Sequence, residues 1–415
     1  MDTLKLINTT IAVVFFVCYA YQFFYIPIPH LKAPPPHSPA KANRYAVCIC
    51  ARNEEAVITD LIDSLKAQTY DPRLFSVFVI ADNCTDSTAE KARRAGAIVY
   101  ERENKKHVGK GYALECLLDH INRDCPGAFD GYFVFDADNI LEPDYIEQMN
   151  RSFSDGYDIV TSYRNSKNYG DNWISAGYAL WFLRESRYLN NARMLLNTSC
   201  AVSGTGFVFS QRILDSTGGW HFHLLTEDIE FSVHHILRGV KIGFCPEAVL
   251  YDEQPVLFSQ SWRQRMRWAK GYLQVFQRYG ADLVGGALRG SFSCFDMSMA
   301  IMPAIVLTVI SLIANLSLAL LGAAFGDDIM LVLQPFAQML INTYLMIFVL
   351  GAITTVSEWN SIRACTQSTL LYMFTFPLFM LTYIPISLAA LFVQVEWKPI
   401  EHRVSAAMLR AAERR

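Results

Sequence analysis

Four long stretches of this chain contain no charged residue, and they constrain its fold more than any other feature. They cover residues 6–28, 297–325, 329–356 and 369–395, and each is at least 23 residues long. About 20 apolar residues in a helix cross the hydrocarbon core of a bilayer. We therefore expect an N-terminal membrane helix and a C-terminal bundle of membrane helices. An uncleaved export signal is the alternative for the first stretch, because no small-residue cleavage site follows it.

Between the first and second stretches the composition is that of a water-soluble domain, with regular charges and turn residues. We expect residues 1–40 to form the anchor and a Pro-rich linker, and residues 41–290 to form the soluble domain. Residues 291–396 are expected to form membrane helices, and residues 397–415 a basic tail. The chain is thus predicted to be an integral membrane protein.

The charge balance excludes one class of partner. Charged residues make up 18% of the chain, below the usual share of about 25%, and the formal net charge is −3. A nucleic-acid-binding protein needs a concentrated basic face, which this balance does not provide. The ten cysteines form no CxxC pair, so neither a zinc site nor a disulfide framework is indicated.

Basic residues beside the apolar stretches predict the orientation. Lys32 and Lys41 follow the first stretch, and Arg278 and Arg289 precede the second. Because positive residues favour the cytoplasmic side, the soluble domain is expected in the cytoplasm at the plasma membrane. The tail is also basic, yet three C-terminal crossings would place it outside. Either the third stretch, which contains Gln334 and other polar residues, is re-entrant, or the tail is exported.

The soluble domain alternates apolar strand-like runs with helix-like segments. Strands are predicted at 45–51, 75–81, 97–100 and 131–135, and helices at 56–67 and 87–95. This alternation predicts an α/β domain with a mostly parallel sheet. In such sheets ligands bind beyond the carboxyl ends of the strands. Three strand ends deliver acidic groups to that edge: Glu54 and Glu55, then Asp82, then Asp136 and Asp138.

The motifs at this edge narrow the chemistry. The dinucleotide fingerprint GxGxxG and the phosphate loop GxxxxGK[ST] are both absent, which disfavours hydride transfer and P-loop ATP hydrolysis. Two carboxylates one residue apart, Asp136 and Asp138, can hold a hard divalent cation that bridges a diphosphate. A surface acidic turn is the plain alternative, and the buried strand before the pair favours the cation site.

Three further motifs each allow two interpretations. Thr226-Glu-Asp228 opens a helix-like stretch, so its acids either suit the helix dipole or place a general base in a pocket. Gly204-Thr-Gly206 forms either a tight turn or a close backbone approach to a ligand. Gln264-Arg-Met-Arg-Trp268 is typical of an interfacial helix, and its cations and tryptophan also suit a diphosphate and a sugar ring.

As an ordered set, Asp82, Asp136-Ala-Asp138, Thr226-Glu-Asp228 and Gln264-Arg-Met-Arg-Trp268 resemble the membrane-integral family-2 glycosyltransferases. This inverting GT-A group contains the cellulose, chitin, hyaluronan and poly-N-acetylglucosamine synthases. The likeness runs from residue 45 to about residue 279 and extends to the flanking membrane segments. It implies a GT-A α/β domain in the cytosol, and Mg²⁺ or Mn²⁺ as the cofactor.

The resemblance also implies roles for individual residues. It assigns donor binding to Arg52, Glu54, Asp82, Lys110, Asp136, Gln264 and Arg267, metal binding to Asp136 and Asp138, acceptor binding to Gly204, Thr205, Gly206, Glu227 and Trp268, and general-base catalysis to Asp228. The implied partners are a UDP-sugar donor, a saccharide or lipid acceptor and membrane lipid.

The function implied is inverting β-glycosyl transfer of Glc or GlcNAc from a UDP-sugar to a growing envelope polysaccharide. Two departures matter: no counterpart of the cellulose synthase gating loop follows Trp268, and only four apolar stretches are present. Single transfer to a membrane lipid is therefore the alternative, since sequences similar to ceramide glucosyltransferase share the QxxRW motif. A transport or scaffold protein is disfavoured, because the apolar stretches carry no ionisable acid or base of the kind that solute pumps need.

Overall fold

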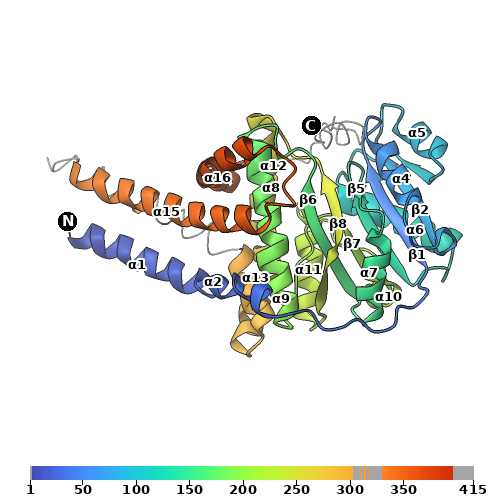
Figure 1. Cartoon of the computed structure of the whole chain (residues 1–415), viewed down its shortest axis with the longest axis horizontal. Coiled ribbons are helices and arrows are strands. Elements are labelled where there is room, and N and C mark those ends of the chain that lie inside the picture. The colour runs from blue at the N-terminus through green and yellow to red at the C-terminus, as the bar shows by residue number, and fades with distance from the viewer. Residues whose placement is uncertain (1, 302–309, 311–312, 315–316, 318–329, 396–415) are drawn as a thin grey trace.

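The computed structural model describes residues 2–301, 310, 313–314, 317 and 330–395. Most of the second apolar stretch, 297–325, lies outside these residues. The described part is an α/β domain built on one eight-stranded sheet, from which helices α1 (Asp2–Tyr19) and α15 (Met330–Ser357) extend on one side (Figure 1).

The four strands predicted from the apolar runs are present as the first four along the chain, and the described residues contain eight strands in all. They are β1 (Tyr45–Ala51), β2 (Phe75–Asp82), β3 (Ile98–Arg102), β4 (Gly131–Asp136), β5 (Ile140–Leu141), β6 (Ile159–Ser166), β7 (Phe207–Ser210) and β8 (Ile242–Asp252). Their order in the sheet is β3-β2-β1-β4-β7-β6-β8-β5. The first four of these are parallel, as expected.

The second half of the sheet is mixed, but four of the seven strand pairings in the sheet are parallel, so the sheet is mostly parallel as expected. Strand β7 pairs antiparallel with both β4 and β6, and β5 pairs antiparallel with β8. Only β6 and β8 are parallel in that half. An apolar run predicts a buried strand but carries no sign of its direction, so the sequence does not distinguish these pairings.

Helices cover both faces of the sheet. In the domain they are α4 (Ile58–Lys66), α5 (Thr88–Arg94), α6 (Lys110–Asp124), α7 (Tyr145–Ser154), α8 (Trp173–Arg184), α9 (Asn191–Leu195), α10 (Gln211–Thr217), α11 (Glu227–Leu237) and α12 (Phe258–Leu288), with a π-helical turn over Glu185–Asn190 and a short 3₁₀ helix over Pro72–Leu74. The remaining helices are α2 (Tyr21–Tyr25), α3 (Ile28–Leu31), α13 (Phe292–Ile301), α16 (Thr366–Leu381) and α17 (Tyr383–Phe392).

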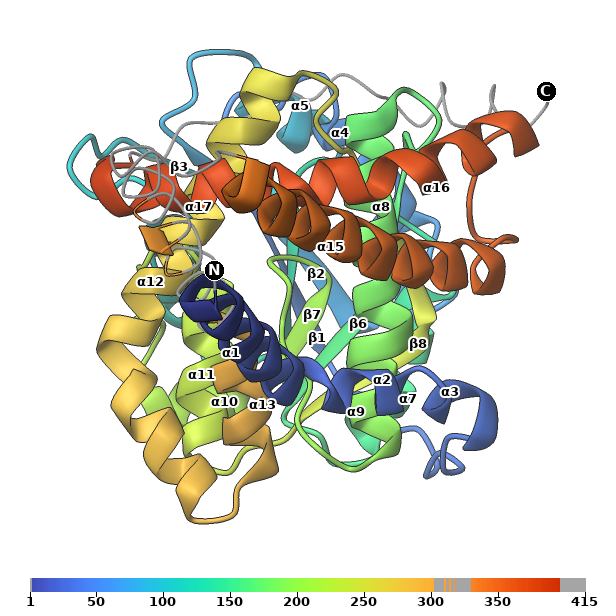
Figure 2. The same cartoon turned by 90° about the vertical axis from the view of Figure 1, so that its left-hand side faces the viewer.

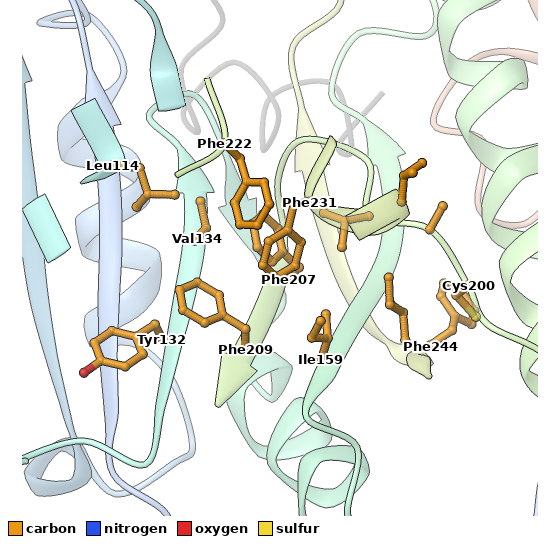
Figure 3. Packing of buried hydrophobic residues seen from close by; sticks show 14 of the residues in the cluster. Leu114, Tyr132, Val134, Ile159, Cys200, Phe207, Phe209, Phe222, Phe231 and Phe244 are labelled. Carbon is orange, nitrogen blue, oxygen red and sulfur yellow. The ribbon is translucent and has the colours of Figure 1, made fainter. Parts of the chain in front are cut away.

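Two hydrophobic cores lie on opposite faces of the sheet, because successive strand residues point to opposite sides. Val47 and Ile49 of β1 face the core under α4 and α7, whereas Cys48 faces the core under α6, α8 and α11. Figure 3 shows the second core, where Phe207 of β7 packs against Phe231 of α11 with ring centroids 5.8 Å apart. These cores hold the strand ends in a fixed relation.

The N-terminal anchor is tied to the domain by a buried polar cluster. The Asp296 carboxylate of α13 forms an ion pair with Arg193 of α9, with an N–O distance of 2.7 Å. It also accepts hydrogen bonds from the hydroxyls of Tyr21 at 2.7 Å and Tyr25 at 3.0 Å. Because Arg193 and Asp296 are both almost fully buried, this cluster fixes α2 against α9 and α13.

Among the described residues, three helical segments are long and apolar enough to cross a membrane: Thr9–Leu31, Leu340–Ser357 and Thr366–Phe392. The predicted N-terminal anchor and the third and fourth apolar stretches each overlap one of these segments. Figure 1 shows α1 and α15 lying along the page and α16 nearly end-on. Figure 2, turned by 90°, shows α16 along its length across the domain.

Candidate active site

One deep cavity of about 1450 Å³ lies at the carboxyl ends of the parallel strands. Of the fourteen residues predicted to form the site, twelve line it: Arg52, Glu54, Asp82, Lys110, Asp136, Asp138, Gly204, Glu227, Asp228, Gln264, Arg267 and Trp268. Residues that are up to 216 positions apart in the chain, from Arg52 to Trp268, thus share one space.

The ends of β1 and β2 form one corner of the cavity. Asp82 is almost fully buried and pairs with Arg102 of β3 at 2.5 Å. The chain leaves β1 through Asn53, whose backbone is left-handed with φ 57°, and the Glu54 amide then donates to the Thr88 hydroxyl at 2.8 Å. This turn directs the polar residues after β1 toward the cavity.

Lys110 connects two of the predicted motifs. Its ammonium group at the start of α6 donates to the Asp136 carboxylate at 2.5 Å and to the Gly204 carbonyl at 2.7 Å. Gly204 has φ 78°, and a Cβ placed there would lie 3.6 Å from an oxygen of Asp228. The backbone at Gly204 therefore lies beside the acid of α11, and its left-handed φ is the feature that favours glycine there.

The two aspartates at the carboxyl end of β4 fit a divalent cation. Asp136 and Asp138 both face the cavity, and Asp138 accepts from the Glu253 amide at 2.7 Å. No group of three or more His, Cys, Asp or Glu residues within the described ranges forms a ready metal cluster. Two carboxylates completed by phosphate oxygens and water are the usual protein ligation of Mg²⁺, so the donor set present suits a cation that arrives with a diphosphate.

Sequence reasoning missed Asp252, which lies at the end of β8 in the same corner. Burial raises its pKa to about 6, and the nearby Asp138 and Asp136 add to this shift while Arg164 opposes it. Asp252 pairs with Arg164 of β6. The sequence did contain a signal for Asp252, because this aspartate ends an apolar run just as Asp136 does.

Glu227 and Asp228 begin α11 and face the cavity. Burial raises the pKa of Glu227 to about 7, the Asp228 carboxylate adds to the shift, and Lys110 and Arg267 oppose it. The pKa of Asp228 is also raised, chiefly by burial, although the Ile229 amide and the two cations lower it. A carboxylate with a raised pKa in a pocket is suited to accept a proton near neutral pH.

The Gln264–Trp268 motif lies on α12, where it forms one wall. Arg267 donates to the Leu225 carbonyl at 2.9 Å, which holds its guanidinium beside the start of α11. Among the described residues, the buried side-chain oxygen of Gln264 accepts no hydrogen bond. The Trp268 ring packs edge-on against Tyr178 with centroids 5.7 Å apart, so a rigid aromatic surface borders the cavity.

Thr205 and Gly206 lie behind the cavity wall, unlike the other predicted residues. Both are buried, and the Thr205 hydroxyl contacts the Asp136 amide at 2.9 Å. A Cβ at Gly206 would lie 1.9 Å from a methyl carbon of Leu250. These two residues shape the loop that presents Gly204, and the spacing of the motif did not reveal which of the three faces the cavity.

Comparison with known proteins identifies the family. Residues 42–271 match the family described as glycosyltransferase-like family 2, which covers more than half of the chain. The chain belongs to this family. The predicted family membership and the GT-A α/β fold are thereby confirmed.

Relatives in this family differ in what their names say they make. The chain is 25% identical over 237 residues to a beta-monoglucosyldiacylglycerol synthase of Synechocystis, which covers 56% of this chain and 48% of that protein. It is 27% identical over 238 residues to the poly-beta-1,6-N-acetyl-D-glucosamine synthase of Staphylococcus aureus, covering 54% of each. The chain thus spans about half the length of the curated relatives it matches.

A solved structure supports the fold over nearly the whole chain. The mannosyltransferase PcManGT of Pyrobaculum calidifontis, solved with GDP-Man and Mn²⁺, has a TM-score of 0.59 and 16% sequence identity. The alignment covers 94% of this chain and 99% of that one. At this identity the likeness concerns the fold alone, and it extends to the apolar helices outside the α/β domain.

Proposed function

We propose that this chain transfers a hexose, Glc or GlcNAc, from a UDP-sugar to a hydroxyl of a membrane lipid, with inversion at the anomeric carbon and with a divalent cation. The lining of the cavity is the observation that supports a lipid as the acceptor. It runs from Asp82 and Asp138 past Asp228 to apolar side chains of α1, α15 and α17, such as Phe16 and Ile347. A lipid is the acceptor whose hydroxyl and acyl chains match these two environments.

The donor would bind at the corner formed by the ends of β1 and β2. We assign the nucleoside to Arg52, Glu54 and Asp82, which line that corner. Asp136 and Asp138 would hold Mg²⁺ or Mn²⁺, which offsets the charge of the diphosphate leaving group. Lys110 and Arg267 both interact electrostatically with Glu227 and Asp228, and they add positive charge to the same space.

Asp228 would act as the general base. The acceptor hydroxyl oxygen attacks the anomeric carbon and forms the new C–O bond, while the bond from that carbon to the diphosphate breaks with its electron pair. Asp228 takes the hydroxyl proton, and UDP leaves with the negative charge. A single displacement inverts the anomeric carbon, so an α-linked donor yields a β-linked product and no covalent enzyme intermediate is needed. Trp268 and Gly204 would border the acceptor sugar or head group.

Transfer to a growing polysaccharide is the second candidate. It is supported by the likeness to the poly-beta-1,6-N-acetyl-D-glucosamine synthase of Staphylococcus aureus and by Trp268, whose ring surface suits a terminal sugar. The far end of the cavity is mostly apolar, with a few polar side chains such as Gln338 and Asn342. This balance favours the lipid, because a polysaccharide would need polar groups all along its path.

A transfer assay with the purified full chain in lipid nanodiscs tests the proposal. Radiolabelled UDP-Glc, UDP-GlcNAc and GDP-mannose are supplied with Mg²⁺, with Mn²⁺ or with EDTA. We expect a labelled product soluble in chloroform–methanol from one UDP-sugar, lost with EDTA. A labelled chain retained on a sizing column would establish the second candidate instead. Transfer from GDP-mannose alone would overturn the nucleotide assignment, and transfer unaffected by EDTA would overturn the cation.

A further inference from the structure

The last apolar segment, Thr366–Phe392, is attached to the catalytic domain at its beginning, its middle and its end. Just before it, the Asn165 amide of β6 donates to the Ser361 carbonyl at 2.9 Å. Near its middle, Arg265 of α12 donates to the Phe379 carbonyl at 3.0 Å. Near its end, Lys270 of α12 donates to the Ala390 carbonyl at 3.0 Å.

The middle attachment is a buried contact with a cation. Arg265 is completely buried and also donates to the Thr382 hydroxyl at 2.6 Å, at the break between α16 and α17. Its guanidinium lies 4.2 Å from the centre of the Phe379 ring. A Cβ on Gly177 of α8 would lie only 2.3 Å from that same ring, so α16 is in close contact with the domain on a second side.

These contacts are incompatible with a membrane crossing by this segment. If it crossed, Phe379 and Thr382 would lie at the centre of the bilayer, and Arg265 would lie there with them. Arg265 sits between Gln264 and Arg267, which face the cavity that reaches the strand ends. Placing this turn of α12 in hydrocarbon would bury several charged groups at a cost of several kcal/mol.

We infer that Thr366–Phe392 lies flat on the membrane surface at the catalytic domain's side and does not cross the bilayer. Its outward face is apolar, as a helix lying in the interface requires. The exposed side chains of this face are Leu370, Leu371, Phe374, Leu378, Leu391 and Phe392. Figures 1 and 2 show α16 running transverse to α1 and α15.

This arrangement resolves the conflict over the basic tail. Helix α15 is continuous over Met330–Ser357 and is therefore not re-entrant. Its C-terminal end meets the domain, where Glu358 contacts Tyr163 and Arg187. Since α15 returns to the domain and the following segment stays there, residue 395, the last one that the structure describes, lies on the domain's side. We therefore expect the basic tail, residues 397–415, on that side. The basic residues beside the first two apolar stretches and those of the tail would then lie on the same side of the membrane.

Protease protection of tags tests the side of the tail. One cleavable tag is placed at Gly127, in an exposed loop of the domain, and another after Arg415. Both are exposed to protease in sealed vesicles of each orientation. We expect the two tags to be cleaved together in one orientation and protected together in the other. Cleavage of the two tags in opposite orientations would overturn the inference.

Depth measurements test the flat arrangement by a second route. Single spin labels are placed at Leu371, Leu378 and Leu391 in a cysteine-free variant that retains sugar transfer, with Ile341 and Val349 of α15 as matched exposed controls. We expect the first three labels to report one shallow depth and the two α15 labels to differ in depth. A label at Leu378 near the bilayer centre, between shallow labels at the other two sites, would overturn the inference.

Discussion

At the scale of single residues, neighbouring acids in this cavity have different surroundings. Asp228 lies beside the Gly204 backbone, whereas Asp136 is neutralised by Lys110. The sequence predicted most of these residues, because each motif follows a strand or begins a helix. It could not find Arg164 and Glu185, which also line the cavity, since no local pattern distinguishes them from ordinary strand and helix residues.

Replacing Asp228 with Asn tests the proposed base. We expect the rate of sugar transfer to fall by about 10²–10⁴-fold, because general-base assistance is worth this much. The affinity for UDP should remain unchanged, since the amide is isosteric and Asp228 is assigned to the acceptor proton. Radiolabel transfer and calorimetric titration of UDP measure the two quantities. Full activity in the variant would disprove the assignment.

The raised pKa values at the start of α11 predict the pH dependence of transfer. The base works only when deprotonated, so the rate falls as the pH drops through its folded pKa. The pKa of Asp228 is raised, and that of Glu227 lies at about 7. The acid limb of the pH–rate profile should therefore lie above the ordinary aspartate pKa of about 4.

Glu227→Gln is the matched control for this profile. It removes one repelling charge and should move the acid limb to lower pH. UDP release measured from pH 4.5 to 9 gives both profiles. A limb that stays in place in this variant, or one that persists in the residual activity of Asp228→Asn, would contradict the prediction.

At the scale of elements, helix α12 contacts the cavity with one face and the last apolar segment with another. One presents Gln264, Arg267 and Trp268 to the cavity, and the other holds α16 and α17 through Arg265 and Lys270. The motif and its helix were predictable from composition, including the expectation that it lies at the membrane. The docking of the fourth apolar stretch along α12 could not be predicted. Length and hydropathy are the same for a helix that crosses the membrane and for one that lies flat on it.

Gly177→Ala should loosen the packing of α16 on α8. A Cβ there would lie 2.3 Å from the Phe379 ring, and overpacking of this kind costs about 1–3 kcal/mol. Thermal unfolding in detergent should show a lowered Tm. Gly285→Ala in α12 is the control, because the nearest atom to its Cβ would be 3.7 Å away on Arg289. Equal Tm values for the two variants would argue against the tight contact.

At the scale of the whole molecule, the cavity joins a nucleotide-sugar region to apolar helices. The α/β domain was predictable from its strand–helix alternation, and the anchor from its hydropathy. The continuity between the two could not be predicted, since it depends on how α1, α15 and α17 pack on the domain. This continuity is why the geometry favours a lipid acceptor over the polysaccharide that the motifs favoured.

Ile347→Trp tests whether the membrane end of the cavity admits the acceptor. Ile347 lines the cavity. Val349 lies two residues later, on roughly the opposite face of α15, and is 51% exposed, so it serves as the control for the same substitution. We expect kcat/KM for the lipid to fall about 5- to 150-fold in the first variant, because a misfit of about 1–3 kcal/mol implies a change of this size. The affinity for UDP should be unchanged. Equal transfer by the two variants would remove the cavity from the acceptor path.

The polar cluster around Asp296 has a practical consequence for anyone wishing to produce this enzyme without its anchor. Starting the chain at Lys41 would delete Tyr21 and Tyr25, whose hydroxyls contact that carboxylate, and each lost bond to a charged group is worth about 1.5–3 kcal/mol. The truncation would also uncover Arg193. A shortened protein of this kind should be expressed poorly or aggregate, so the anchor belongs to the folding unit and is more than a tether.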